Sequence, residues 1–332
     1  MGSINMLSIG ITICDKDYQK LDSLLAQIEE RIKIEHEVII IDNREQFKDE
    51  KTSWTPSYSF GYNAYQFSAR AKIIELAKGD YIWFVDGDDN VEEVDEFDYT
   101  EDIIVFSYHS YPSGDIHIDE NVYTENLFSY DISTLIRPVL WNKFVKRSLF
   151  TKEFIKRNFG KKIVTNEDTL WGYEALRNAS SLRIVDKIIY HHNEGLSNRV
   201  DNVSLAEFES LVTGFEEMKE ETRRIIKDDT FFNKSMYDTA CHLMRYATKT
   251  KEPYGVLDIM LKLIPWELFK EALFDSVYPF CKSQENLNNI IKHLSKNFGG
   301  EPPFKQVREM VTFEDGSVRE VFFTQTIEFD KL

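Results

Sequence analysis

Three aspartates, Asp86, Asp88 and Asp89, stand within four positions directly after the apolar run Tyr81–Val85. Carboxylates this close disfavour one another's charge, so a nearby cation would stabilise them. Mg²⁺ and Mn²⁺ prefer oxygen ligands, commonly one or two carboxylates together with phosphate oxygens and water. The D-x-D pattern at the end of a buried strand therefore predicts a divalent ion that holds a diphosphate, with Asp88 as a ligand and Asp86 or Asp89 beside it.

This acidic stretch also allows two other interpretations, a solvated acidic surface and a calcium-binding loop. Residues 92 to 102 are acidic almost throughout, and such runs usually form solvated surface. A calcium loop of the EF-hand type would place oxygen ligands at Asp88 and Asn90, but Val91 stands where that loop needs Gly and Phe97 where it needs Glu. A strand also precedes the cluster where a helix would be required, so we reject the calcium loop.

Alternating strands and helices are expected to position these aspartates. Apolar and β-branched runs predict strands, and apolar residues on one face of a helical repeat predict helices. The expected elements are strands at 7–14, 37–42, 81–85 and 103–108, and helices at 17–32 and 64–78, the second closed by Gly79. This order predicts an α/β fold with a doubly wound, mostly parallel sheet, in which ligands bind beyond the carboxyl ends of the strands. Asp42 and Asp86 both stand at such ends.

The character of the chain changes near residue 205. Helical patterns run from 206 to about 297, "GGEPP" follows, and Asp315-Gly316 predicts the turn of a β-hairpin. We therefore expect one domain over 1–205 and a smaller helical region with a β-hairpin over 206–332. Because the helices are apolar on one face, we expect this region to pack on the first domain, on the side where an acceptor substrate would bind, or to form a homo-oligomer.

The segment "NAYQFSARAKIIELAKGDYIWFVDGDD" resembles the nucleotide-sugar half of family 2 glycosyltransferases of the GT-A fold, which is Rossmann-like. The matching positions are Asn63, Ala69, Arg70, Ala77, Gly79, Tyr81 and the three aspartates; Ala71, Ile73 and Asn43 depart from the family pattern. The first strand departs more, because Thr12 and Cys14 stand where a Pro and an aromatic residue are usual.

Three later segments also resemble motifs of that family, in the family's order. They are "LWNKFVKRSLF" (140–150), "NEDTLWGYEAL" (166–176), with Asn166 for Gly and Trp171 for Phe, and "YHHNEGLSN" (190–198), with His192 for Tyr and Asn193 for Arg. The resemblance covers residues 7 to 200. It implies an inverting hexosyltransferase that uses Mn²⁺ or Mg²⁺ and a nucleotide sugar, most commonly a UDP-sugar.

The resemblance also implies roles for individual residues. Asp42 would bind the base. Asp88, Asp86 and Asp89 would surround the metal, although the first Asp of the motif, here Asp86, more often contacts the ribose in the family. Asp168, beside Glu167, would take the proton of the acceptor hydroxyl. The remaining donor-site candidates are Thr12, Asn63, Arg70, Gly87 and Arg199, with His192 as a third metal ligand.

Structural alternatives stay open at several of these positions. Asp42 could be a turn aspartate, and Glu167 and Asp168 could serve the N-terminus of a helix, where acidic residues are favourable. His192 is more often a packing residue, and Arg199 equally fits a surface ion pair. Trp141 and Trp171 could form a floor for a sugar or belong to the core.

Composition limits the partners. A net charge of −17 argues against a nucleic-acid binder. Three distant cysteines, Cys14, Cys241 and Cys281, fit a reduced compartment, and no apolar run approaches the roughly 20 residues of a membrane span. These features predict a cytoplasmic protein. The family resemblance implies an enzyme of bacterial surface polysaccharide synthesis that acts on a glycan, lipid-linked or protein acceptor.

Two rival functions differ in class. A sugar-phosphate nucleotidylyltransferase would need a Gly-rich phosphate loop with a basic residue after the first strand, and "GITICDKD" lacks one. A degenerate transferase that only binds a nucleotide or sugar, or acts as a scaffold, is disfavoured by the intact D-G-D-D and E-D motifs. The altered first strand and Asn193 keep that second rival open.

Overall fold

The structure, a computed structural model, describes residues 6–13, 18–43, 54–62, 64–95, 100–111, 113–137, 139–161, 163, 167–193, 205–249, 304–312 and 318–326. The chain divides into two compact units. One comprises Met1–Arg199 and Thr213–Lys234, the other Val200–Val212 and Ser235–Leu332. The boundary expected near residue 205 stays a prediction. Within the described residues, no helix combines the length and apolar character needed to span a bilayer.

The first unit is built on a mixed sheet. Its strands are β1 (Leu7–Ile13), β2 (His36–Asp42), β3 (Tyr58–Ser59), β4 (Tyr81–Asp86), β5 (Asn90–Val91), β6 (Ile103–Tyr111), β7 (Gly114–Ile116), β8 (Asn121–Tyr123), β9 (Lys143–Lys146) and β10 (Leu182–Asn193). The order is β3-β2-β1-β4-β9-β6-β10-β5, with β7 on β6 and β8 on β10. β1, β2, β3 and β4 run parallel, as do β6 and β10. The expected α/β sheet is therefore present, but β9 runs antiparallel between β4 and β6.

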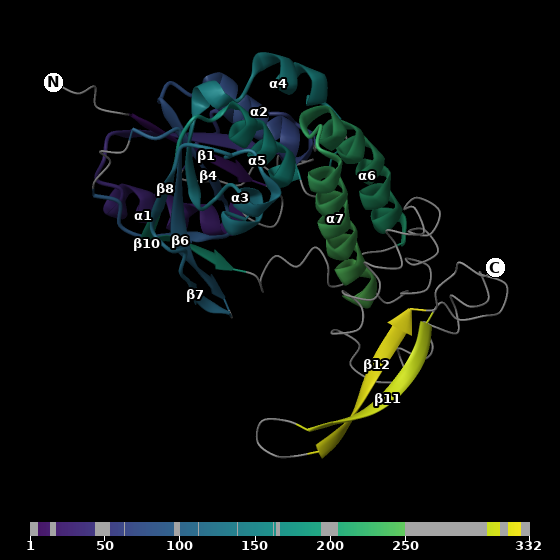
Figure 1. Cartoon of the computed structure of the whole chain (residues 1–332). Coiled ribbons are helices and arrows are strands. Elements are labelled where there is room, and N and C mark those ends of the chain that lie inside the picture. The colour runs from purple at the N-terminus through teal and green to yellow at the C-terminus, as the bar shows by residue number, and fades with distance from the viewer. Residues whose placement is uncertain are drawn as a thin grey trace. The chain divides into compact units, whose positions relative to one another are not determined.

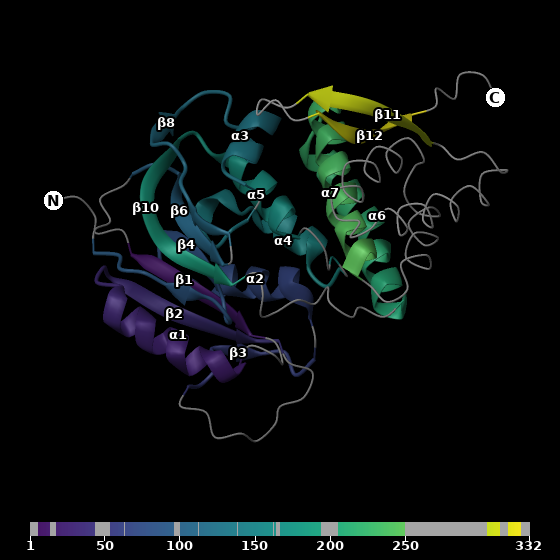
Figure 2. The same ribbon diagram turned by 90° about the horizontal axis from the view of Figure 1, so that it is seen from below.

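Helices cover both faces of this sheet (Figures 1 and 2). α1 (Tyr18–Arg31) lies on one face and α2 (Tyr65–Leu76) on the other. The further helices of the described residues are α3 (Tyr130–Leu135), the 3-10 turn η1 (Arg147–Leu149), α4 (Lys152–Asn158), α5 (Glu167–Asn178), α6 (Leu205–Ile225) and α7 (Asp229–Lys249). Ile9 and Ile11 of β1 join a buried cluster with Leu24 of α1. On the opposite face α2 packs so closely that a Cβ on Gly10 would lie 2.3 Å from Ile73 Cγ2.

Gly79 does not end α2 as the sequence suggested. The C-cap is Ala77, in an extended conformation with φ −59° and ψ 134°. Gly79 instead lies against β1, where its amide donates to Ser8 Oγ at 2.9 Å. A Cβ there would stand 2.7 Å from Met6 O and Ser8 N. Glycine is needed at this position for close approach to the strand.

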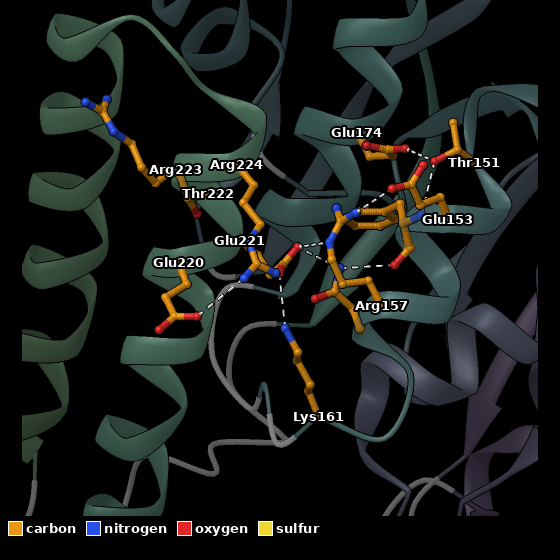
Figure 3. A network of polar contacts seen from close by, with 12 residues as sticks. Thr151, Glu153, Arg157, Lys161, Glu174, Glu220, Glu221, Thr222, Arg223 and Arg224 are labelled. Carbon is orange, nitrogen blue, oxygen red and sulfur yellow. Dashed lines mark hydrogen bonds and ion pairs between the residues drawn. The ribbon is translucent and has the colours of Figure 1, made fainter.

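The part of α6 from Thr213 onward and the start of α7 belong to the first unit and pack on its other elements. Glu221 of α6 is fully buried and accepts hydrogen bonds from Arg157 Nε (2.7 Å), Asn158 Nδ2 (3.1 Å) and Lys161 Nζ (3.1 Å), and it also pairs with Arg224 (Figure 3). Phe231 of α7 packs among three aromatic rings of the neighbouring segments, Phe128, Tyr130 and Tyr173.

In the second unit, β11 (Phe304–Thr312) and β12 (Val318–Thr326) pair antiparallel, with Phe304 opposite Thr326 and Thr312 opposite Val318. The turn expected at Asp315-Gly316 lies outside the described residues.

Candidate active site

Strand ends bring the predicted donor residues to one edge of the sheet. Parallel pairing places Thr12 of β1 opposite Asp86 of β4, and Ile13 opposite Asp42 of β2. The two aspartates therefore stand at neighbouring carboxyl ends, on either side of β1. This is the edge at which ligands bind in open α/β sheets.

The residues Asp86–Asp89, here called the aspartate turn, leave β4 in a tight turn. The Asp89 amide donates to Asp86 O at 3.2 Å, and Gly87 between them is buried. Asp86 and Asp88 are partly exposed, whereas Asp89 is buried. The two outer carboxylates of the turn thus differ in how far water reaches them.

Both oxygens of Asp89 are engaged within the protein. Oδ1 accepts a hydrogen bond from the Asn193 amide at 2.8 Å, and Oδ2 accepts one from the Tyr190 hydroxyl at 2.7 Å. His192 Nδ1 lies 3.1 Å from Oδ2, and its ring stacks on Trp141 with centroids 4.9 Å apart. This carboxylate ties the aspartate turn to the end of β10.

A buried arginine gathers the other acidic residues. Arg70 of α2 is 3% exposed, and its guanidinium lies 3.6 Å from Asp86 Oδ1 and 3.3 Å from Glu167 Oε1. It also forms an ion pair with Asp168. Glu167 and Asp168 occupy the first turn of α5. Packing of α5 beside α2 thus brings the predicted base to the strand-end motif, with one guanidinium among three carboxylates.

The charge balance of this site shows in Asp86. Burial raises the pKa of its carboxyl to about 6; Arg70 and His192 oppose the shift, and Asp89 and Asp88 add to it. The carboxylates of Asp88 and Asp89 disfavour the charge of Asp86, and a cation beside all three would favour it. The electrostatics of the site therefore agree with the cation expected from the sequence.

The donor set fits a divalent ion under one condition. Across the part of the chain that the structure describes, no three His, Cys, Asp or Glu side chains are arranged to hold a metal ion. Asp86 and Asp88 supply two carboxylates, which is a common protein contribution to Mg²⁺ or Mn²⁺ when phosphates and water complete the shell. These residues fit an ion that arrives with a diphosphate.

The remaining predicted residues have varied surroundings. Thr12 is buried and its hydroxyl accepts a hydrogen bond from Gln66 Nε2 at 2.6 Å. Asp42 is fully buried at the end of β2. Asn63 and Arg199 lie outside the described residues.

The two tryptophans proposed as a sugar floor are buried. Trp171 is fully buried and stacks on Phe67 at 4.4 Å, so it belongs to the core. Trp141 is 5% exposed and stacks on Tyr190 as well as on His192. The core interpretation is correct for both, because neither ring has a free face wide enough for a sugar.

Two residues at this site were not anticipated. Lys20 Nζ of α1 donates to the Asp88 carbonyl at 3.3 Å, which places an ammonium group beside the aspartate turn. Tyr190 contacts Asp86 and Asp89, and burial, together with those two carboxylates, raises the pKa of its hydroxyl well above the usual value. The only sequence signal was the place of Tyr190 at the start of the "YHHNEGLSN" segment.

Comparison with solved structures identifies the fold. S. aureus TarS 1-349 in complex with UDP-GlcNAc matches at a TM-score of 0.57 and 15% identity, over 97% of this chain and 99% of that one. The chain has the GT-A fold. The same protein in complex with UDP matches at 0.54 and 14% identity, over 97% and 98% of the two chains. A longer S. aureus TarS structure matches at 0.51 and 14% identity, over 95% of this chain and 60% of that one. Protein-family models gave no match, and neither did curated protein sequences.

The two acidic segments whose sequences resemble glycosyltransferase motifs are the aspartate turn at the end of β4 and the Glu167-Asp168 pair at the start of α5. The fold places both at the same edge of the sheet, and Arg70 joins them.

Proposed function

We propose that this chain is an inverting glycosyltransferase that moves a sugar from a nucleotide diphosphate sugar to a hydroxyl group, with Mn²⁺ or Mg²⁺ bound. The observation that carries the proposal is the contact of Arg70 with both Asp86 and Asp168. It sets a carboxylate able to take a proton beside a strand-end motif able to hold a metal–diphosphate. A binding protein would have no need for the first of these groups.

Asp88 and Asp86 would bind the metal ion, and the ion would bind the diphosphate of the donor. When bound, the ion acts as a Lewis acid on the diphosphate and stabilises the charge of the leaving group. Asp42, at the next strand end, would accept a hydrogen bond from the base. Asp89 is left out of the metal site in this proposal because both of its oxygens already accept hydrogen bonds.

Asp168 would act as the general base. It takes the proton of the acceptor hydroxyl while that oxygen forms a bond to C1 of the sugar. The bond from C1 to the diphosphate oxygen breaks on the opposite face, and its electron pair leaves with the nucleotide. An α-linked donor would then give a β-linked product. A positioned base of this kind contributes roughly 10²–10⁴-fold to the rate.

UDP-GlcNAc is the first donor to test, because a structure with the same fold contains it. Thermal shift should show stabilisation by UDP-GlcNAc, or by another UDP-sugar, that depends on Mn²⁺, and UDP release should follow in the same conditions. Asp88→Asn should keep the fold and lose the Mn²⁺-dependent stabilisation. The proposal would be wrong if Mn²⁺ and Asp88→Asn left nucleotide-sugar binding unchanged.

One observation favours a non-catalytic alternative. Asp168 forms an ion pair with the buried Arg70, so its charge is already partly neutralised before any acceptor arrives. A chain that binds UDP-sugars tightly but releases no UDP with any acceptor, and none by hydrolysis, would be a nucleotide-sugar-binding protein.

For the glycosyltransferase, the acceptor class we propose is a bacterial surface glycan.

A further inference from the structure

The hydroxyl of Tyr190 joins the two ends of the aspartate turn. It accepts a hydrogen bond from the Asp86 amide at 3.0 Å and donates one to Asp89 Oδ2 at 2.7 Å. Asp86 begins the turn and Asp89 ends it, so one oxygen atom fixes both. Asp88, the proposed metal ligand, lies between the two bonded residues.

Packing holds this hydroxyl in place. Tyr190 is fully buried, and its ring stacks on Trp141 with centroids 4.9 Å apart and planes within 14°. The rings of Tyr190 and Trp83 of β4 pack edge to face, with centroids 6.2 Å apart. Trp83 Nε1 in turn donates a hydrogen bond to the Trp141 carbonyl at 2.6 Å. Since these rings lock the side chain, the hydroxyl has little freedom to follow a moving turn.

The same strand holds the turn at further points. The Asn193 side chain donates to the Asp88 carbonyl at 2.9 Å, and the Glu92 amide donates to Ile189 O at 2.9 Å. Strand β10 therefore holds the aspartate turn by several hydrogen bonds, and Tyr190 is the residue of β10 that contacts Asp86.

We propose that Tyr190 is a positioning residue for metal binding: its hydroxyl holds the aspartate turn so that Asp86 and Asp88 present their carboxylates to one cation. This inference rests on the proposed function. Tyr190 does not touch the ion, and acts through the backbone of Asp86 and the side chain of Asp89. Loss of such a supporting hydrogen bond typically costs 10–100-fold in metal affinity.

Tyr190→Phe removes the hydroxyl and keeps the stacked ring. Tyr81→Phe is the matched control, because Tyr81 is 1% exposed at the other end of β4 and its hydroxyl donates to the Glu101 carbonyl at 2.7 Å. Free Mn²⁺ is measured by electron paramagnetic resonance with UDP present. Tyr190→Phe should bind Mn²⁺ about tenfold more weakly, whereas Tyr81→Phe should match the wild type. UDP binding without metal should be equal in all three.

Asp89→Asn gives a second test of the same link, since an amide cannot accept at both positions. It should weaken Mn²⁺ binding to a similar degree, and the double variant should lose less than the product of the single losses. Wild-type Mn²⁺ affinity in both single variants would overturn the inference alone, and so would an equal loss in Tyr81→Phe. Absence of Mn²⁺ binding in the wild-type protein with UDP would overturn the proposed metal site, and the inference with it.

Discussion

The Arg70 guanidinium on α2 lies 3.6 Å from the Asp86 carboxylate at the end of β4. Because the same group also contacts Glu167 and Asp168, a single buried cation partly compensates three acidic side chains. The remaining negative charge is what a metal–diphosphate complex would meet. Arg70 is therefore expected to influence both the stability of the fold and the ionisation of its neighbours.

Arg70→Met should destabilise the folded protein by about 3 kcal/mol near neutral pH, since it leaves three partly buried carboxylates uncompensated. The pKa of Asp86, about 6, is raised above its unfolded value of 3.8. The folded protein thus binds more protons than the unfolded chain between those values, and the contribution of Asp86 to stability is lost as pH rises through about 6. Without Arg70 the pKa of Asp86 should rise further. The loss of unfolding free energy in Arg70→Met, relative to the wild type, should therefore become smaller as pH falls from about 7 to 5.

Urea unfolding at both pH values measures this effect. Lys72→Met on the same helix is a suitable control, because its partner Glu75 is exposed and such pairs contribute roughly 0–1 kcal/mol. A deficit of equal size at the two pH values would show that Asp86 is not the group that Arg70 compensates.

Asp168→Asn should fold and bind the UDP-sugar about as well as the wild type while losing on the order of 10²–10⁴ in turnover. The amide keeps the size of the side chain but cannot take the acceptor proton. Glu167→Gln should lower turnover much less, although Glu167 also contacts Arg70. Steady-state kinetics separate the two, and NMR of the product from an α-linked donor should show a β linkage. An α-linked product would exclude the single displacement.

Glu221→Gln should weaken the docking of α6 on α4. Burial, which alone would raise the pKa of Glu221, is outweighed by hydrogen bonds from Arg157, Lys161 and Asn158, and the pKa is lowered below 4.5. The stabilisation is therefore present above the unfolded pKa and is lost as pH falls through the folded one. We expect the variant to lose about 2 kcal/mol of unfolding free energy near neutral pH, and this loss should become smaller as pH falls below 4.5. Thermal unfolding across that range measures it, and a gap independent of pH would contradict the ion network.

Gly79→Ala should cost about 1–3 kcal/mol, because the new methyl group would overlap backbone atoms of Met6 and Ser8 and force β1 and β4 apart. Gly172→Ala tests the opposite case. It lies inside α5 with no atom within 4 Å of the added Cβ, so helix propensity should stabilise the protein by about 0.5–1 kcal/mol. Chemical unfolding of both variants checks the pair. Equal effects would mean that close approach at Gly79 is not what requires glycine.

Local signals in the sequence determined the core of this fold. The apolar runs that end at Asp42 and Asp86, and the helical repeat of Leu21, Leu24 and Ile28, predicted β2, β4 and α1 at nearly their observed positions. They could do so because hydrophobic periodicity depends on residues a few positions apart. The edge of the sheet where the aspartates meet follows from parallel pairing of such strands.

Only the tertiary structure decided which partner each polar group meets. Arg70 reaches Glu167 across 97 positions, and the Tyr190 hydroxyl reaches the Asp86 amide across 104. Asp89 matched a metal-ligand motif in the sequence, but both of its oxygens accept hydrogen bonds from residues of β10. The ring of Trp171 is likewise enclosed by Phe67 and Phe154. Hydrogen bonds and ring contacts depend on distances of a few ångströms between separate elements, and those distances are set when the helices and strands pack together.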